Sequence, residues 1–263
     1  MKYLALLIAL LFLYPAEGNE KIDVVVTVPS LAEFVRAAGG NGAEVTILLP
    51  PGASPHTYEP TPGQLSTASG ADLFVVVGSG METEMQLLKA FKNSKTLVNA
   101  SEGINLIDRD PHVWLSLRNA AIMVDNICKA FVEIDPQNRT EYEQNRDSYT
   151  KKLASLDAKL GEELSGVEKI LVFHGAWDYF CRDYGIEQLA IKEGGKEPTP
   201  ARISEVIEIA KREGIKLVFT EPQEDIRYAE LIAREIEGRV VVIDPLAEDY
   251  VENMQNVAGA MKG

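Results

Sequence analysis

The stretch Ile22-Asp23-Val24-Val25-Val26-Thr27-Val28-Pro29-Ser30-Leu31-Ala32-Glu33 shows how this chain folds. Its first half is a strand-like apolar run, and the helical stretch that follows opens with Ser30 and Glu33 at the spacing of a capping box. The same order of strand and helix recurs up to residue 99. Such alternation predicts a parallel sheet with helices on both faces. The predicted strands are residues 23–28, 45–49, 73–77 and 96–99.

The same alternation returns after Glu168, where helical stretches at 202–212 and 227–236 separate the strand-like runs. We therefore predict an α/β protein with two similar lobes, each a parallel sheet flanked by helices. In the first lobe, Thr61-Pro62-Gly63-Gln64 repeats the capping-box spacing, with proline at the first helical position. The predicted strands of the second lobe are residues 170–173, 189–191, 217–220 and 240–243.

A polar, strongly helical stretch at about 138–164 lies between the two lobes. Pro136 separates it from the preceding helix, because proline disfavours helix in the residue before it. Its leucines recur at three- and four-residue spacing, which predicts one long linking helix. The expected organisation is an N-terminal lobe over 19–136, a linking helix over 137–165 and a C-terminal lobe over 166–263.

The first residues have the features of a secretory signal peptide: Met1-Lys2, an apolar run over 3–14, and small residues up to Gly18. The apolar run is shorter than the roughly 20 residues that span a bilayer. We expect cleavage after residue 18 and a mature protein at the periplasmic or extracellular face of a membrane. Retention of the segment as a tether is the alternative. No cysteine near its end could carry a lipid, and we expect Cys128 and Cys181 to be buried free thiols rather than a bridge.

The chain carries a formal net charge of -14. This charge argues against nucleic acid as a partner, because binding to phosphates requires a basic surface. The simplest explanation of the negative charge is a well-solvated surface. A more specific explanation is that the charge raises the local concentration of cations. We expect a monomer.

Only three histidines occur, and each stands beside a proline or glycine in a strand-end context: His56, His112 and His174. Asp244 follows an apolar strand-like run in the same way. Ligands in open parallel sheets bind beyond the carboxyl ends of the strands. His56 and His112 belong to the first lobe and the other two residues to the second. Together they could bind one divalent metal ion in the cleft between the lobes.

Other polar and aromatic residues near these positions have expected supporting roles. Glu59 could replace Asp244 as a ligand, although a hydrogen bond within its own loop is the favoured prediction. Glu221, at a strand end, could orient His174 without binding metal. We expect four aromatic residues to pack around the site, namely Trp114, Trp177, Tyr179 and Phe180.

Five motifs together resemble the substrate-binding proteins of zinc and manganese ABC importers. They begin at Pro55 (Pro-His-Thr-Tyr-Glu-Pro), Asp110 (Asp-Pro-His-Val-Trp-Leu-Ser), Phe173 (Phe-His-Gly-Ala-Trp-Asp-Tyr-Phe), Phe219 (Phe-Thr-Glu-Pro-Gln) and Ile243 (Ile-Asp-Pro-Leu). The resemblance runs in order over nearly the whole mature chain. It implies a two-lobed receptor that works with a membrane permease. It also implies that His56, His112, His174 and Asp244 bind the metal.

The sequence departs from this family in two respects. Zinc-uptake members often carry a long loop rich in histidine and acidic residues between the first two ligands, whereas residues 57–111 contain no histidine. Many relatives in Gram-positive bacteria are lipoproteins, and this chain lacks the cysteine that would carry the lipid.

Three alternatives compete with a zinc receptor. A secreted hydrolase could hold catalytic zinc with the same histidines, although Asp244 would then occupy the position of the attacking water. A scaffolding protein could use the metal only for stability. A manganese receptor is the third. Manganese-specific relatives commonly have a glutamate where this chain has His174, and imidazole ligands suit zinc better than manganese, so we predict Zn²⁺ as the transported ligand, with Mn²⁺ as the alternative.

Overall fold

The computed structural model describes residues 21–91, 97–107, 110–192 and 197–262, and contains two four-stranded parallel sheets. The first has the strand order β2-β1-β3-β4, and the second has the corresponding order β6-β5-β7-β8. All eight strands lie within two residues of the predicted positions at each end, which confirms the two-lobed α/β fold. The strands are β1 Ile22–Val26, β2 Ala43–Ile47, β3 Leu73–Val76, β4 Leu97–Asn99, β5 Lys169–His174, β6 Glu187–Lys192, β7 Leu217–Thr220 and β8 Arg239–Val242.

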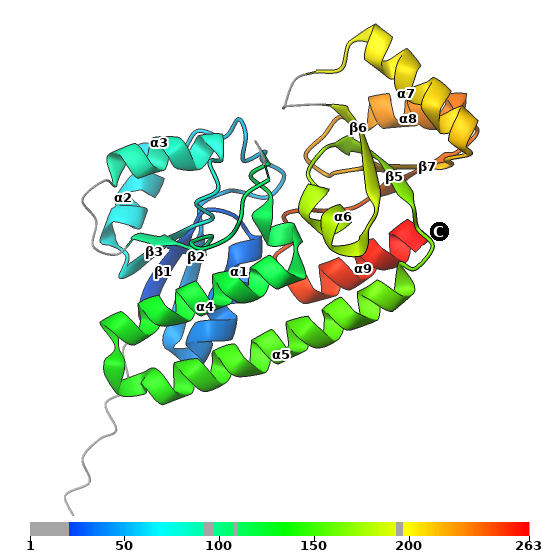
Figure 1. Cartoon of the computed structure of the whole chain (residues 1–263). Coiled ribbons are helices and arrows are strands. Elements are labelled where there is room, and N and C mark those ends of the chain that lie inside the picture. The colour runs from blue at the N-terminus through cyan, green and yellow to red at the C-terminus, as the bar shows by residue number, and fades with distance from the viewer. Residues whose placement is uncertain (1–20, 92–96, 108–109, 193–196, 263) are drawn as a thin grey trace, which may run out of the picture.

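Helices cover both faces of each sheet (Figure 1). The α-helices are α1 Ser30–Gly39, α2 Pro62–Gly70, α3 Glu82–Ala90, α4 Leu117–Ile134, α5 Arg139–Glu163, α6 Asp178–Tyr184, α7 Pro200–Glu213, α8 Ile226–Glu235 and α9 Tyr250–Lys262. Short 3₁₀ turns lie at η1 Gly40–Gly42, η2 Val113–Leu115 and η3 Pro136–Asn138.

The two predicted capping boxes have different outcomes. Thr61 caps α2 as expected, since its hydroxyl accepts a hydrogen bond from the Gln64 amide and the Gln64 side chain accepts one from the Thr61 amide. The prediction for Ser30 is wrong. Pro29, the residue before α1, already has helical dihedral angles, so Ser30 is the first residue of the helix rather than its cap. The Ser30 hydroxyl instead donates to the Pro245 carbonyl at 3.3 Å, a contact between the two lobes.

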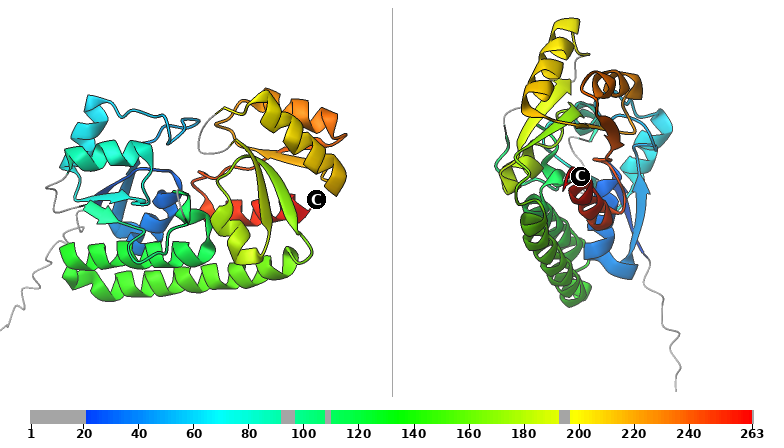
Figure 2. Two further views of the ribbon diagram at one scale, coloured as in Figure 1. Left: turned by 45° about the horizontal axis from the view of Figure 1, so that its top comes forward. Right: turned by 90° about the vertical axis from the view of Figure 1, so that its right-hand side faces the viewer.

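The expected linking helix is α5, which runs beneath both sheets (Figure 1 and Figure 2). Its leucine positions face the protein interior, where α5 packs against α4, α1 and α9. The rest of the helix surface is polar. The helix is therefore held along its length rather than at its two ends alone.

One continuous hydrophobic core joins the two lobes. It contains Val24 from β1, Leu153 from α5 and Val172 from β5 in a single cluster. At the junction, Phe34 of α1 meets Tyr250 of α9 edge to face, with ring centroids 4.7 Å apart. Separate, smaller cores lie between the outer faces of the sheets and α2, α3, α7 and α8. The lobes thus share packed side chains and are not independent bodies on a flexible hinge.

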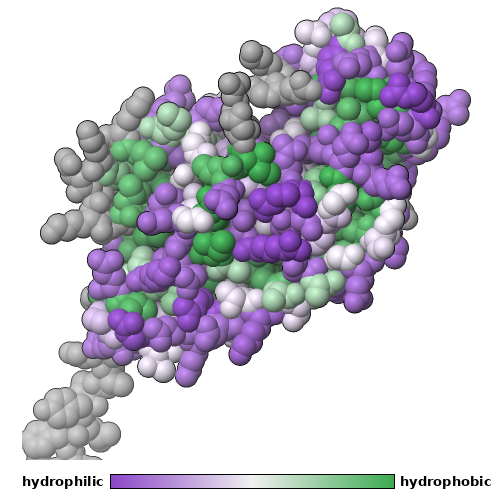
Figure 3. Space-filling model, viewed as in Figure 1, coloured by the Kyte–Doolittle hydropathy of each residue, from purple (hydrophilic) through white to green (hydrophobic). Residues whose placement is uncertain are grey.

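The face of the molecule drawn in Figure 3 is mainly hydrophilic, with apolar residues in scattered groups. In the part of the chain that the structure describes, no helix combines the length and the apolar character needed to cross a bilayer. The predicted signal peptide, residues 1–18, lies outside the described residues. Cys128 and Cys181 are both buried and unpaired, in agreement with the prediction of free thiols.

Candidate metal centre

The structure brings the three histidines together from three separate segments. His56 lies in the loop after β2, His112 directly before η2, and His174 at the last position of β5. The Nε2 atom of His112 is 3.2 Å from Nε2 of His56 and 3.3 Å from Nε2 of His174. Within the described ranges, no other group of three or more His, Cys, Asp or Glu side chains is close enough to hold a metal ion.

Two carboxylates fix the orientation of the first-lobe imidazoles. His56 Nδ1 lies 2.9 Å from Glu82 Oε2, and His112 Nδ1 lies 2.6 Å from Asp110 Oδ1. When these carboxyls are ionised they can only accept hydrogen bonds, so each ring then carries its proton on Nδ1 and has a lone pair on Nε2. The two Nε2 lone pairs then face each other at 3.2 Å. Two lone pairs at that distance repel unless a cation lies between them.

The spacing of the nitrogens suits a small tetrahedral ion. Imidazole nitrogens bound at about 2.0–2.1 Å in a tetrahedron lie roughly 3.3–3.4 Å apart. The two measured separations are 3.2 and 3.3 Å. All three rings line a cavity of about 10 Å³, close to the volume that one water molecule needs. The donor set therefore has the size and geometry for one ion.

Burial keeps two of these imidazoles neutral. Burial, together with the nearby charge of His56, lowers the pKa of His112 to about 3. It also lowers the pKa of His174 to about 2. Burial raises the pKa of the Asp110 carboxyl to about 7. Below about pH 7 the Asp110 carboxyl therefore keeps its proton while the His112 ring stays neutral. A metal ion would not have to displace a proton from His174.

The first turn of α3 holds the loop that carries His56. The Thr83 hydroxyl is buried and lies within hydrogen-bonding distance of the Pro55 and Tyr58 carbonyls, on either side of this histidine. The neighbouring Glu82 contacts the imidazole itself. These residues were missed in the sequence analysis, because Glu82 is 26 positions from His56 and stands in no motif with it. Asp110 could have been found, since it opens the Asp-Pro-His motif.

Asp244 lies outside the close group of ligand atoms. Its Oδ1 accepts hydrogen bonds from Gln223 Nε2 at 3.2 Å and from the Leu246 amide at 2.9 Å. The side chain lines a neighbouring groove of about 500 Å³ rather than the cavity of the imidazoles. Metal binding by Asp244 remains a prediction.

The other two acidic candidates differ in burial. Glu59 is exposed and does not line the cavity of the imidazoles. Glu221 is buried and lines it, but its Oε1 has no hydrogen-bond partner. Nδ1 of His174 also has none, so Glu221 makes no hydrogen bond to this nitrogen, and its role in orienting the ring remains a prediction. Burial raises the pKa of Glu221 well above its ordinary value.

Two of the four aromatic residues expected around the site contact the His112 loop. Trp114, Trp177, Tyr179 and Phe180 are all fully buried. The Trp114 ring centroid lies 5.4 Å from that of His112, and its Nε1 donates to the Pro245 carbonyl at 2.7 Å. The Tyr179 hydroxyl donates to the Asp110 carbonyl. These contacts connect the His112 loop to the second lobe.

Residues 24–263 match the family described as "Zinc-uptake complex component A periplasmic". The chain belongs to this family. It is 30% identical over 253 residues to the high-affinity zinc uptake system protein ZnuA of Bacillus subtilis, covering 87% of this chain and 79% of the relative. It is 30% identical over 262 residues to the manganese ABC transporter substrate-binding lipoprotein PsaA of Streptococcus pneumoniae, covering 88% and 84%.

A crystal structure of ZnuA superposes with a TM-score of 0.88 at 35% identity, covering 92% of this chain and 98% of the other. The protein is therefore a substrate-binding receptor of a metal ABC transporter and not an enzyme. Family membership excludes the hydrolase alternative. Because one relative is named for zinc and another for manganese, the choice of metal depends on the site itself.

Proposed function

We propose that this protein is an extracytoplasmic receptor that binds one zinc ion between its lobes and delivers it to the permease of an ABC importer. The proposed ligands are His56, His112, His174 and Asp244. The observation that carries the proposal is the convergence of the three imidazoles, with Nε2 of His112 lying 3.2 Å from Nε2 of His56 and 3.3 Å from Nε2 of His174. The proposed ligands come from both lobes. We take the N-terminal lobe as residues 19–136, the linking helix as 137–165 and the C-terminal lobe as 166–263.

Asp244 would complete a shell of three nitrogens and one oxygen. Two hydrogen bonds hold Oδ1, which leaves Oδ2 for the metal. Since the side chain borders a neighbouring groove, its binding requires the loop after β8 to approach the imidazoles. A four-coordinate shell of this composition is typical of zinc.

The nitrogen-rich donor set supports zinc over manganese. Manganese prefers carboxylate, carbonyl and water oxygens, whereas imidazole suits zinc. Zinc also exceeds manganese in affinity at almost any site of this kind. Affinity alone therefore cannot identify the metal that the transporter uses, and the experiment must measure binding and use separately.

Metal-stripped protein titrated with zinc should bind one ion per chain and melt at a higher temperature. A ligand that binds only the folded state stabilises it by about 2.7 kcal/mol at a free concentration of 100 times Kd. The physiological metal is tested by the growth of cells that depend on the intact transporter. Growth restored by manganese and not by zinc would assign the receptor to manganese.

Zinc binding should change the overall shape little. The continuous core and the packing of α5 against α1 and α9 favour small rocking of the lobes over wide closure. We expect the radius of gyration from X-ray scattering to be almost the same before and after zinc is added. A large decrease on binding would show that the lobes close about a hinge instead.

A further inference from the structure

The cavity of the three imidazoles is also lined by oxygen-bearing side chains from one loop of the second lobe. These are Glu221, Gln223 and Glu224, which follow β7. Carboxylate and amide oxygens are ligands that suit manganese. Yet within the described residues only the three imidazoles come close enough together to form a ligand group. The oxygen-bearing side chains line the same cavity, but their oxygen atoms lie outside the close group formed by the three imidazoles.

A lysine holds one of these carboxylates. Lys192 Nζ lies 3.0 Å from Glu224 Oε1 and 3.1 Å from Oε2, so it contacts both oxygens. The Lys192 and Glu224 side chains are only 13% and 14% exposed, which shields the pair from solvent. A shielded pair costs more to separate than an exposed one, because either partner alone would be left as an uncompensated and partly buried charge. Glu224 is thereby held in one position.

The backbone places Lys192 next to a metal-site histidine. It is the last residue of β6 and pairs in parallel register with His174, the last residue of β5. A fixed positive charge beside a cation site weakens the binding of every cation. A lysine at this position therefore requires an explanation other than metal affinity.

We propose that Lys192 is a specificity-determining residue, because it binds both oxygens of Glu224 and so keeps this carboxylate out of the metal shell. This inference rests on the proposed function, in which the imidazoles bind the metal. With Lys192 in place, the shell stays rich in nitrogen and suits zinc. Without it, the freed Glu224 carboxylate adds oxygen ligands inside the same cavity and improves the site for manganese.

The test compares zinc and manganese affinities in wild type, Lys192→Gln, Glu224→Gln and the double variant. In Lys192→Gln the ratio of manganese to zinc affinity should rise by about tenfold, the size of effect typical of residues just outside a metal shell. In the double variant the ratio should return to the wild-type value, because Glu224 is no longer a carboxylate. Lys192→Arg keeps the ion pair and should keep the ratio.

Cobalt(II) gives a spectroscopic readout of the shell. Four-coordinate cobalt absorbs visible light strongly, and added oxygen ligands reduce the intensity. Lys192→Gln loaded with cobalt should therefore absorb less than wild type, and the double variant should recover the wild-type spectrum. A role of Lys192 in stability alone would leave the spectrum unchanged.

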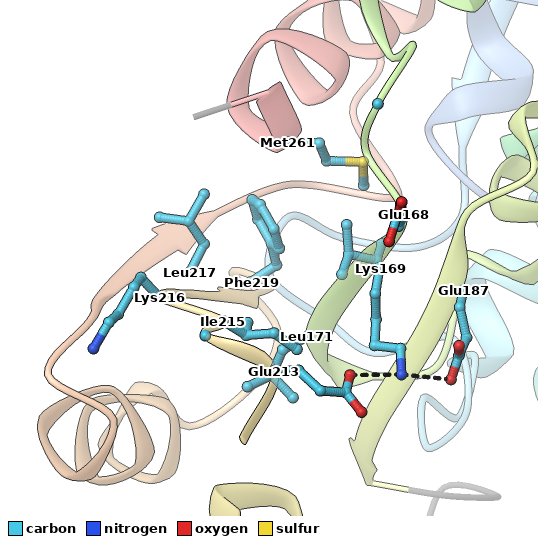
Figure 4. A pocket seen from close by; sticks show the side chains of 13 residues that line it. Glu168, Lys169, Leu171, Glu187, Glu213, Ile215, Lys216, Leu217, Phe219 and Met261 are labelled. Carbon is cyan, nitrogen blue, oxygen red and sulfur yellow. Dashed lines mark ion pairs between the residues drawn. The ribbon is translucent and has the colours of Figure 1, made fainter. Parts of the chain in front are cut away.

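Lys169 provides a matched control at the opposite end of the same sheet. Its Nζ lies 2.9 Å from Glu187 and 2.7 Å from Glu213, and its side chain is 20% exposed (Figure 4). It stands at the start of β5, in a pocket of about 690 Å³ that none of the histidines lines. Lys169→Gln removes a partly buried lysine with two glutamate partners, and should leave the metal ratio unchanged.

The possible results distinguish a failure of the proposed function from a failure of the proposed role of Lys192. Wild type that binds no metal, or that binds it fully after loss of a histidine, would refute the proposed function. Wild type that binds zinc, together with an unchanged ratio in Lys192→Gln, would refute the role of Lys192. A raised ratio that persists in the double variant would show a simple charge effect. Lower affinity for both metals in the double variant, in which neither charge of the pair remains, would show that Glu224 is already a ligand and would refute the role of Lys192.

Discussion

His112→Ala is expected to lower zinc affinity by a hundredfold to a thousandfold. Sites with four ligands bind zinc with about 10–16 kcal/mol, so one ligand contributes about 3–4 kcal/mol. His112 is the central member of the group, since its Nε2 lies 3.2 and 3.3 Å from the other two. Its removal leaves two imidazoles without the nitrogen that lies between them. Competition with a chelator of known affinity measures the loss.

The apo protein serves as the folding control for this variant. His112 is buried and bonded to Asp110, so its loss also leaves a buried carboxyl with one partner fewer. The melting temperature without metal measures that effect separately. If folded His112→Ala bound zinc as tightly as wild type, the metal would be held elsewhere. Zinc should also raise the melting temperature of wild type far more than that of the variant.

The strands and the lobes could be predicted because their signals are local. Runs such as Val24-Val25-Val26 are bounded by helical stretches, and the parallel pairing follows from that alternation. The start of α2 could be predicted for the same reason, because the capping box of Thr61 needs only Gln64, three residues later. Ser30 has the same spacing but different neighbours. Pro29 shifts the helix start, and the second lobe supplies a partner that no local pattern shows.

The convergence of the three histidines can be predicted from one rule about parallel sheets. The hydrogen-bond partners of these histidines cannot be predicted in this way. Strand ends of two parallel sheets face one cleft, so the positions of His56, His112 and His174 indicated a shared site. The contact of His56 with Glu82 depends on how α3 packs against a distant loop. The separation of Asp244 from the group depends on Gln223, a side chain from another strand end. Such contacts are set by tertiary packing.

The metal-free protein is expected to lose stability at low pH because of His174. In the unfolded chain its imidazole binds a proton below about pH 6.5. In the folded protein burial lowers the pKa to about 2, so the ring stays neutral. Between these values the unfolded state binds one more proton, and stability must fall as pH falls. The slope approaches about 1.4 kcal/mol per pH unit once the unfolded imidazole is fully protonated, so about 2 kcal/mol is lost between pH 6.5 and 4.5.

Other titrating groups also change the stability of the metal-free protein with pH, but they do not alter the contribution of His174. Between about pH 4 and 6.5 the folded Asp110–His112 pair binds one proton, on Asp110, because the pKa values are about 7 and 3. The unfolded pair also binds one proton, on His112. The pair therefore contributes almost nothing to the change of stability with pH in this range. Burial raises the pKa of Glu84 and Glu221, and these carboxyls act in the opposite sense, since the folded state takes up their protons first. The total slope is therefore a sum of several groups, and His174 must be isolated with a variant.

His174→Gln removes the titrating ring and keeps a neutral polar side chain of similar size. Urea unfolding of both metal-free proteins at several pH values between 6.5 and 4.5 gives two curves of stability against pH. Groups common to both proteins contribute equally, so the slopes should differ by up to about 1.4 kcal/mol per pH unit, with wild type losing more as pH falls. Parallel curves would mean that folded His174 takes up a proton in this range. In the proposed function, the second lobe therefore presents a neutral His174 to the metal, and binding at this ring needs no imidazolium to lose a proton first.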